Sequence, residues 1–294
     1  MTMQKRHRIL IATDGSPPAH AALATAVKFP WAKPSIARAL VAPSNWLHPK
    51  SDAAVAALER SFEAIADAAR RTLAQRWPAA EAVVVDESPV DAILGSAKRF
   101  DATVIVLGWR GHGTFRRLLA GSVSRSVAAR AHCPVLVVRA PVRSVRRLVV
   151  GFDGCPNAER AVDFVSSLEP ARGSHVVLVN VVAPVSLPAS LARLPASTRA
   201  QIRHAATSLK EERYREAHAT VEAGVARLKQ AGWRATSDIR VGAPLASLLG
   251  AADDHQADIL VLGARATSGV ERALLGSVAN GALNRSRVPV LLVR

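Results

Sequence analysis

Short apolar runs alternate with longer segments of helical periodicity along the whole chain. The first run, at 8–13, is followed by an Asp14-Gly15 turn and reads as a buried strand, whereas the segment 51–76 repeats apolar residues at helical spacing. By the same criteria, the pattern of the first half predicts strands at 8–13, 37–42, 82–85, 103–107 and 135–138. It predicts helices at 19–28, 51–76, 89–98 and 122–131. Such alternation favours an α/β fold with a parallel sheet covered on both faces.

The second half repeats this order of elements. Its predicted strands lie at 148–152, 176–182, 236–241, 259–262 and 290–293, and its helices at 158–168, at 200–230, after Pro244 and from Ser277. A proline-rich insertion at 184–198 accounts for most of the extra length of this half. We therefore expect two tandem domains, 1–141 and 148–294, joined by a linker at 142–147.

The repeat is clearest in a glycine-spaced motif after the fourth strand of each half. The two copies read Gly108-x2-Gly111-x9-Gly121-Ser122 and Gly263-x2-Ala266-x9-Gly276-Ser277. Each half also places an Asp-Gly turn, at Asp14 or Asp153, after its first strand. We expect two Rossmann-like domains, each with a five-stranded parallel sheet in the order 3-2-1-4-5, in which strands one and four are neighbours.

Two bends in the first half would therefore meet at one crevice, where a phosphate chain could lie. Glycine allows the backbone to approach a phosphate closely, and the helix that starts at Ser122 adds free N–H groups and a positive end. The Asp14 carboxylate is placed to accept hydrogen bonds from ribose hydroxyls or an adenine amino group. Side chains that would assist are Ser122, Ser124, Arg110, Arg116 and Arg117. Each feature alone is also an ordinary turn or helix cap, but their combination in both halves favours a nucleotide site.

Composition and charge indicate which ligands and which cellular compartment suit this site. The chain has 294 residues, 49% of them hydrophobic, and a formal net charge of +16, which favours anionic partners such as nucleotides, nucleic acid or an acidic membrane surface. No apolar run approaches the roughly 20 residues of a membrane span, and no signal peptide is visible. Cys133 and Cys155 stand at unmatched positions of the two halves, which fits a reducing cytoplasm better than a disulfide framework.

The strand before Asp14, the first glycine motif and the run from Cys133 to Val138 together resemble the universal stress protein family, as two tandem copies over nearly the whole chain. The resemblance implies an adenine nucleotide alpha hydrolase-like fold and a cytoplasmic stress-response protein of the ATP-binding branch, often with magnesium. It also places the backbone of Val41, at the end of the second strand, against the adenine edge. The implied nucleotide-binding residues are Ala12, Thr13, Asp14, Val41, Gly108, Arg110, Gly111, Gly121, Ser122, Val123 and Ser124 in the first half, and Asp153, Gly263, Arg265, Gly276 and Ser277 in the second.

Two departures indicate that the second site is weaker. Ala266 replaces the second glycine of the motif, and its methyl group would cost about 1 kcal/mol if that position needs a positive φ. Ala279 stands where the first half has Ser124. Trp109 is bulky for a phosphate loop, and we expect it to point away from the phosphates, toward a partner surface.

The sequence favours binding over catalysis. It contains no G-x-x-x-x-G-K-[ST] loop and no paired carboxylates at metal-site spacing, and His112 in the loop is a more natural hydrogen-bond donor than a base. The preferred hypothesis is an ATP-dependent regulator with a protein partner. A slow ATPase and an interaction module that uses its basic surface on nucleic acid remain as alternatives.

The last predicted strand of each half, 135–138 and 290–293, is wholly apolar. An exposed edge of this kind needs cover, so we expect the two strands to pair within the chain and form a pseudo-dimer of the two halves. A homodimer of whole chains is compatible with this arrangement.

Overall fold

The computed structural model describes residues 7–42, 51–109, 122–264 and 275–294. The first half contains β1 (His7–Thr13), α1 (Pro17–Lys28), β2 (Ser35–Val41), α2 (Asp52–Ala74), β3 (Glu81–Val84), α3 (Pro89–Arg99), β4 (Val104–Gly108), α4 (Ser122–Arg130) and β5 (Val135–Val138). The second half contains β6 (Arg147–Gly151), α5 (Pro156–Ser166), β7 (His175–Val182), the 3-10 helix η1 (Ala189–Arg193), α6 (Ala196–Gln230), β8 (Arg234–Val241), α7 (Pro244–Asp254), β9 (Ile259–Gly263), α8 (Ser277–Arg285) and β10 (Val290–Val293).

All ten strands belong to one sheet, in the order β3-β2-β1-β4-β5-β10-β9-β6-β7-β8. Each half has the predicted order 3-2-1-4-5, but the prediction of two separate five-stranded sheets is wrong. The reason lies at the centre, where β5 and β10 pair antiparallel with Leu136 opposite Leu291, while the other paired strands run parallel. The two apolar final strands thus cover each other's edges within the chain.

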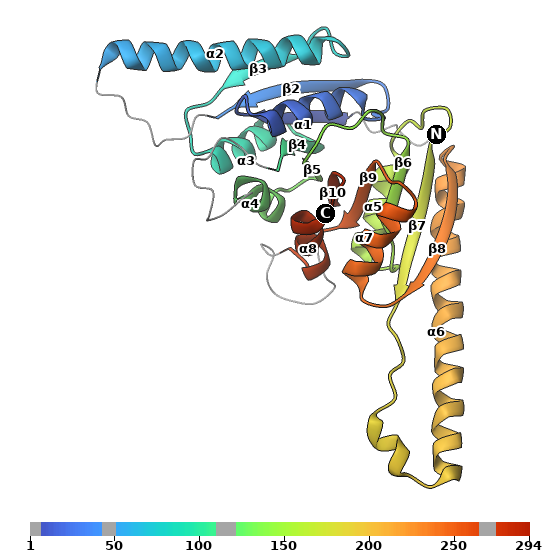
Figure 1. Cartoon of the computed structure of the whole chain (residues 1–294). Coiled ribbons are helices and arrows are strands. Elements are labelled where there is room, and N and C mark those ends of the chain that lie inside the picture. The colour runs from blue at the N-terminus through green and yellow to red at the C-terminus, as the bar shows by residue number, and fades with distance from the viewer. Residues whose placement is uncertain (1–6, 43–50, 110–121, 265–274) are drawn as a thin grey trace.

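Helices cover both faces of the sheet (Figure 1). Side chains alternate between faces along each strand, so they form two apolar cores. One core joins β-strand residues to α1, α2, α5 and α6, through side chains such as Leu23, Leu73, Val162 and Val225. The other joins the sheet to α3, α4, α7 and α8. Both cores run through both halves, so the repeats share one continuous interior.

Serine caps start three helices of the first half. The hydroxyls of Ser16, Ser51 and Ser88 accept hydrogen bonds from main-chain N–H groups in the first turns of α1, α2 and α3. In the second half, Cys155 and Ala243 stand before α5 and α7 and make no side-chain cap. Matching helices of the two repeats therefore differ in whether a side chain caps their N-terminus.

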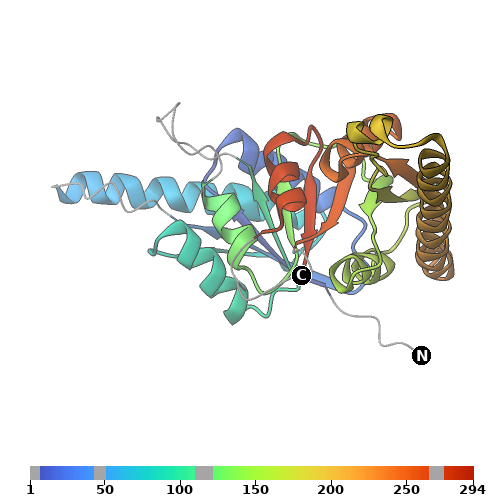
Figure 2. The ribbon, with the colours of Figure 1, turned by 90° about the horizontal axis from the view of Figure 1, so that it is seen from below.

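The longest helix forms an arm. α6 has 35 residues, and its buried residues all lie from Ala217 onward, in the half that packs on β7 and β8. Its other half projects past the sheet beside the segment 183–195 (Figure 1). From below, α2 and α6 lie at opposite ends of the sheet (Figure 2). The arm includes the insertion that the sequence revealed at 184–198.

Candidate functional site

Three neighbouring strands of the first repeat end side by side. Thr13 at the end of β1 is opposite Val41 at the end of β2, and Ala12 is opposite Leu107 of β4. The next residue of β4 is Gly108. The structure therefore brings together Ala12, Thr13, Val41 and Gly108, which are distant in the sequence, at the carboxyl edge where parallel sheets bind ligands.

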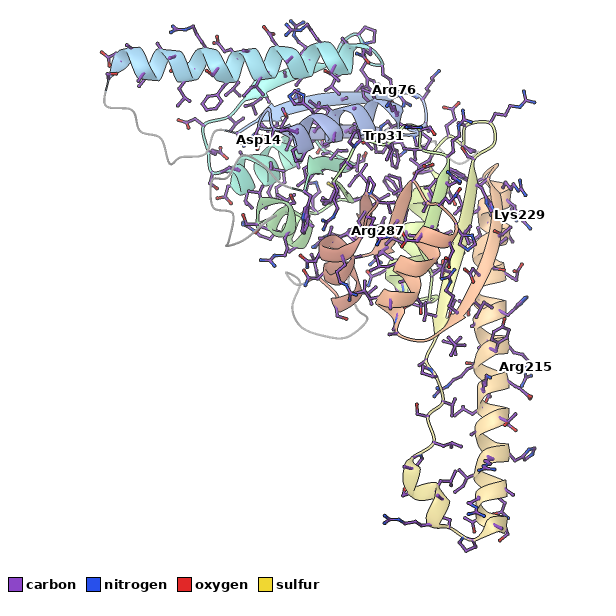
Figure 3. The ribbon with its side chains drawn as sticks, in the orientation of Figure 1. Asp14, Trp31, Arg76, Arg215, Lys229 and Arg287 are labelled. Carbon is purple, nitrogen blue, oxygen red and sulfur yellow. The ribbon has the colours of Figure 1, made fainter. Side chains whose placement is uncertain are left out.

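Asp14 follows this edge in a tight turn (Figure 3). Its Oδ1 accepts a hydrogen bond from the Ser16 N–H at 3.0 Å, while the Gly15 N–H donates to Thr13 Oγ1 at 3.3 Å. Gly15 has a φ of +75°, a conformation that favours glycine. The Asp14 side chain is thus oriented by its own turn and lies at the exposed surface.

Asp153 repeats this turn in the second half. Its Oδ1 accepts from the Cys155 N–H at 3.0 Å, and Gly154 has a φ of +76°. Partial burial, together with the Asp153 carboxylate, raises the pKa of the Cys155 thiol above its ordinary value. The two turns match in geometry, but a neutral thiol replaces the capping hydroxyl of Ser16.

Gly108 is required by packing. A Cβ placed on Gly108 would lie 2.6 Å from the main-chain carbon of Pro18 and 2.9 Å from the nitrogen of Ala19. A Cβ placed on Gly263 would likewise lie 2.9 Å from the main-chain carbon of Asn157. The first glycine of each motif thus lets the fourth strand pass close to the first helix, whether or not a phosphate approaches.

The start of α4 is tied to the end of β4. The Ser124 hydroxyl is buried and donates to the carbonyl oxygen of Gly108 at 2.6 Å, with the Trp109 carbonyl at 3.3 Å. Ser122 is exposed in the first turn and Val123 is half-buried. The Ser124 hydroxyl proton therefore holds the two ends of the motif together, while Ser122 is left at the surface beside the free N–H groups of the helix start.

Trp109 does not point toward a partner surface, which corrects the expectation from its size. Its side chain belongs to the apolar core and the residue is 5% exposed, while its main-chain N–H donates to the Val138 carbonyl at 2.8 Å. The Arg139 guanidinium lies 4.4 Å from the centre of its ring. The bulky residue is accommodated because it turns inward, beneath the start of the motif.

Several predicted residues lie outside the described part of the chain. These are Arg110, Gly111, Gly121 and Arg265 of the expected nucleotide site, together with His112, Arg116, Arg117 and Ala266. Their proposed roles remain predictions from the sequence.

The second motif is closed by a different contact. Gly276 precedes α8 and its N–H donates to the Ala264 carbonyl at 3.0 Å, while Ser277 is exposed in the first turn. Ala279 is buried at the place that Ser124 takes in the first repeat. The hydroxyl tether of the first motif is therefore absent from the second, as the alanine predicts.

The end of the second strand also differs between the repeats, which the sequence analysis missed. The Val41 carbonyl accepts a hydrogen bond from the Val85 N–H at 2.9 Å and retains a second lone pair. The matching position of β7 is Asn180, which is buried and donates through Nδ2 to the Phe152 carbonyl at 2.9 Å. An asparagine inside an otherwise apolar strand was the available signal. The second edge thus carries a side-chain amide that the first lacks.

Within the described ranges, no group of three His, Cys, Asp or Glu side chains is placed to hold a metal ion. In those same ranges, no helix combines the length and the apolar character needed to cross a bilayer.

Comparison with known proteins identifies relatives of both halves. Residues 5–139 and 144–294 each match the model of the universal stress protein family. A universal stress protein of Mycobacterium tuberculosis is 29% identical over 206 residues, which are 66% of this chain and 62% of that protein. One from Thermus aquaticus is 37% identical over 138 residues, 45% of this chain and 97% of that protein. The chain thus spans less than two thirds of the mycobacterial relative.

A solved structure shows a similar fold. The crystal structure of a universal stress protein from Archaeoglobus fulgidus superposes with a TM-score of 0.66 at 20% identity, covering 99% of this chain and 97% of that one. The likeness extends over both repeats and the sheet that joins them.

Proposed function

The chain belongs to the universal stress protein family, as two tandem repeats, and on that premise we propose that it is a cytoplasmic stress-response regulator that binds ATP in its first repeat. The nucleotide state would select a protein partner. The second repeat would bind adenine nucleotides more weakly.

One observation carries the proposal. The Asp14 turn follows β1, the neighbour of the strand that ends at Gly108, and the Ser124–Gly108 hydrogen bond ties the start of α4 to that same strand end. A helix start offers N–H groups and a positive end to an anion, and the carboxyl edge of a parallel sheet is where such ligands bind. The phosphates would therefore lie at Ser122, with the sugar toward Asp14.

The base would then reach the end of β2. The free lone pair of the Val41 carbonyl can accept a hydrogen bond from the adenine amino group, and the exposed Asp14 carboxylate can accept from ribose hydroxyls. Magnesium usually binds through phosphates, water and one or two protein oxygens. Asp14 and Ser122 could supply those oxygens, so the ion would arrive with the nucleotide.

Three differences favour a weaker second site. Asn180 and Phe152 replace Val41 and Thr13 at the strand ends, and Ala279 cannot form the tether of Ser124. The buried amide of Asn180 is already bound to Phe152. The second repeat would therefore have to rearrange its edge before it could receive a base in the same manner.

Calorimetry on the full chain with magnesium and ATP tests the proposal. Asp14→Asn keeps an oxygen for the Ser16 N–H but removes the charge, and Asp153→Asn is the matched control in the second repeat. We expect Asp14→Asn to weaken binding by about tenfold, since hydrogen bonds to charged groups contribute about 1.5–3 kcal/mol. Asp153→Asn should leave the tighter site unchanged.

Absence of heat with any adenine nucleotide would refute the proposal, and equal losses in both variants would refute the ranking of the sites. Mass analysis of ligand released from freshly purified protein gives an independent readout. Phosphate release under single-turnover conditions separates a binding protein from a slow ATPase.

A further inference from the structure

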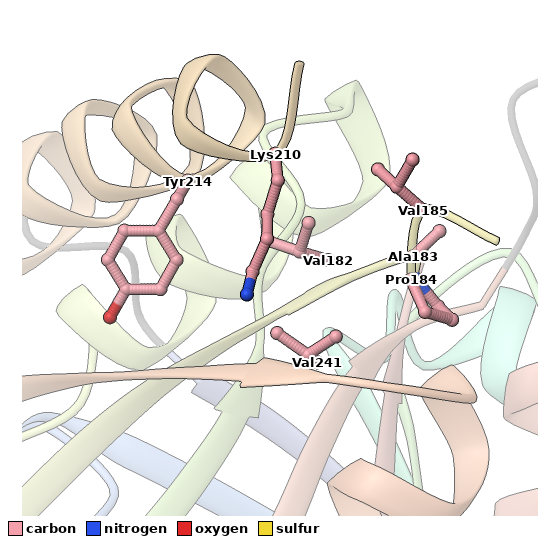
Figure 4. A pocket seen from close by; sticks show the side chains of 7 residues that line it. All are labelled: Val182, Ala183, Pro184, Val185, Lys210, Tyr214 and Val241. Atoms are coloured by element: carbon pink, nitrogen blue, oxygen red, sulfur yellow. The ribbon is translucent and has the colours of Figure 1, made fainter. Parts of the chain in front are cut away.

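A hollow lies at the base of the arm, where β7 and β8 end beside α6 (Figure 4). Its volume is about 160 Å³. It is lined by Val182, Ala183, Pro184, Val185, Lys210, Tyr214 and Val241. Five of these side chains are apolar, one is a cation and one is a phenol.

Among the described residues, the floor of this hollow has no counterpart in the first repeat. β7 and β8 stay paired up to Val182 and Val241, two positions beyond Asn180. In the first repeat the matching ladder ends at Val41 and Val84. The hollow therefore lies at the ends of β7 and β8, the two outermost strands at this end of the sheet, whereas Asp153 comes after β6 and Gly263 is the last residue of β9. None of Asp153, Asn180 and Gly263 lines the hollow, so it differs in its residues from the strand edge of the second repeat.

Its two polar groups come from one face of α6. Lys210 and Tyr214 are four residues apart, so they lie one above the other on the helix. Figure 4 shows Lys210 Nζ and the Tyr214 hydroxyl pointing toward β8. No carboxylate lines the hollow, and among the described residues none forms an ion pair with Lys210. The site thus offers an uncompensated positive charge above an apolar floor.

Large apolar groups also face solvent here. Val241 is 53% exposed and Tyr214 is 46% exposed. A ligand with an apolar body would cover them and remove that surface from water. An apolar cavity of similar volume holds a six-membered ring.

We propose that this hollow binds a small monocarboxylate with an apolar body of about one ring. The ring packs on Val182 and Val241, and the carboxylate accepts charge-assisted hydrogen bonds from Lys210 Nζ and the Tyr214 hydroxyl. A cation finds no counter-charge here. The hollow is too small for a nucleoside triphosphate, and no glycine turn or helix start lines it to hold the phosphates. The inference does not depend on ATP binding in the first repeat.

The chain's single tyrosine makes the test specific. Full-length protein labelled with ¹³C-tyrosine gives one set of aromatic signals, from Tyr214, and these are followed by NMR during titration with benzoate. We expect a saturable shift. Benzyl alcohol, which has the ring but no charge, should bind about tenfold more weakly.

Variants separate the charge from the shape. Lys210→Gln should weaken benzoate binding about tenfold, and Lys210→Arg should restore part of it. Arg215→Gln on the same helix is the matched control, because Arg215 (Figure 3) does not line the hollow and its loss should change nothing. Val241→Phe should fill the floor and abolish the shift, while the circular dichroism spectrum remains that of the parent.

Equal binding of benzoate and benzyl alcohol, or an unchanged affinity in Lys210→Gln, would overturn the proposal. Displacement of benzoate by ATP would overturn it too, since the hollow would then be part of a nucleotide site. Failure of ATP to bind anywhere would leave the Tyr214 titration unaffected, so the two proposals fail separately.

Discussion

Arg139 and Arg294 donate hydrogen bonds to opposite halves of the molecule across the centre of the sheet. Each directly follows the last strand of its own repeat. The Arg139 guanidinium donates to the Leu283 carbonyl in α8, and that of Arg294 donates to the Ala128 carbonyl in α4 at 2.8 Å. Cations are favoured at helix C-terminal ends, where carbonyls lack partners. The two repeats are thus joined by a reciprocal pair of contacts beside β5 and β10.

Removing either guanidinium should loosen this junction. We expect Arg139→Met and Arg294→Met each to lower the free energy of unfolding by about 1–3 kcal/mol, because a buried carbonyl loses a charged donor. Arg139→Met should also change tryptophan emission, because it removes the cation from the Trp109 ring. Urea titration followed by fluorescence measures both effects. The matched control, Arg287→Met, removes an arginine that is 84% exposed and should stay within 0.5 kcal/mol. An equally small loss of unfolding free energy in all three variants would show that Arg139 and Arg294 do not stabilise the junction.

Gly108→Ala should destabilise the first repeat by about 1–3 kcal/mol, since its methyl group meets the backbone of Pro18 and Ala19. Gly95→Ala is the control: its methyl group meets only the flexible end of Arg99, and helix propensity favours alanine. Urea denaturation of the two variants should therefore move in opposite directions. An unchanged free energy of unfolding in Gly108→Ala would show that α1 and β4 can move apart at little cost. Loss of ATP binding in Gly108→Ala is evidence of a phosphate contact only where the variant remains folded.

The sequence predicted the order of elements because each strand and helix carries its own periodicity. It also predicted the pairing of 135–138 with 290–293, because two apolar edges cannot both be left exposed. The description of each half as a separate five-stranded sheet was nevertheless wrong, because this pairing of the two final strands joins all ten strands into one sheet. That outcome depends on the register that places Leu136 against Leu291.

The candidate site was predicted less completely. The spacing of the motif placed Asp14 and Gly108 at neighbouring strand ends, and the structure agrees. The burial of Trp109 and the packing role of Gly108 depend on what α1 and Arg139 contribute from elsewhere in the chain. Such contacts leave no mark on local spacing. The shared ending of the repeats, Val138-Arg139 and Val293-Arg294, was the one signal that could have indicated the arginine pair.

Asp238 should make the free energy of unfolding depend on pH in the acidic range. Partial burial would raise its pKa, but hydrogen bonds from His255 and Arg240 outweigh this and hold the pKa of Asp238 below its ordinary value. A lowered pKa in the folded state contributes stability above the unfolded value, near 3.9, and that contribution is lost as the pH falls through the folded value. We expect Asp238→Asn to cost about 1 kcal/mol near neutral pH and progressively less below about pH 4. Urea titrations across this range measure the difference. Asp67→Asn, which removes an exposed pair with Arg70, should show no such trend.

The two thiols should differ in reactivity. Burial raises the pKa of the Cys133 thiol to about 12, whereas Cys155 is only partly buried, which raises its pKa above the ordinary value. Because the thiolate is the nucleophile, iodoacetamide should modify Cys155 increasingly as the pH rises above the ordinary thiol pKa of about 8.5, and leave Cys133 unmodified until the protein unfolds. Peptide mass spectrometry measures both sites in one sample. Denatured protein, in which both react, is the control, and rapid labelling of native Cys133 would contradict its burial.

Exchanging one hydroxyl between the repeats should separate tethering from phosphate binding. Ser124→Ala removes the hydrogen bond to the Gly108 carbonyl, which leaves a buried acceptor short of a donor, so we expect a loss of about 1 kcal/mol in stability and weaker ATP binding in the first repeat. Ala279→Ser places the hydroxyl at the matching position of α8. If the tether positions the helix start, Ala279→Ser should strengthen nucleotide binding in the second repeat, provided that the added hydroxyl reaches the Gly263 carbonyl. Calorimetry with ATP and urea titration on both variants give the two readouts. A Ser124→Ala variant that loses affinity without losing stability would instead indicate that the hydroxyl contacts the nucleotide directly, and that the bond to Gly108 breaks when the ligand binds.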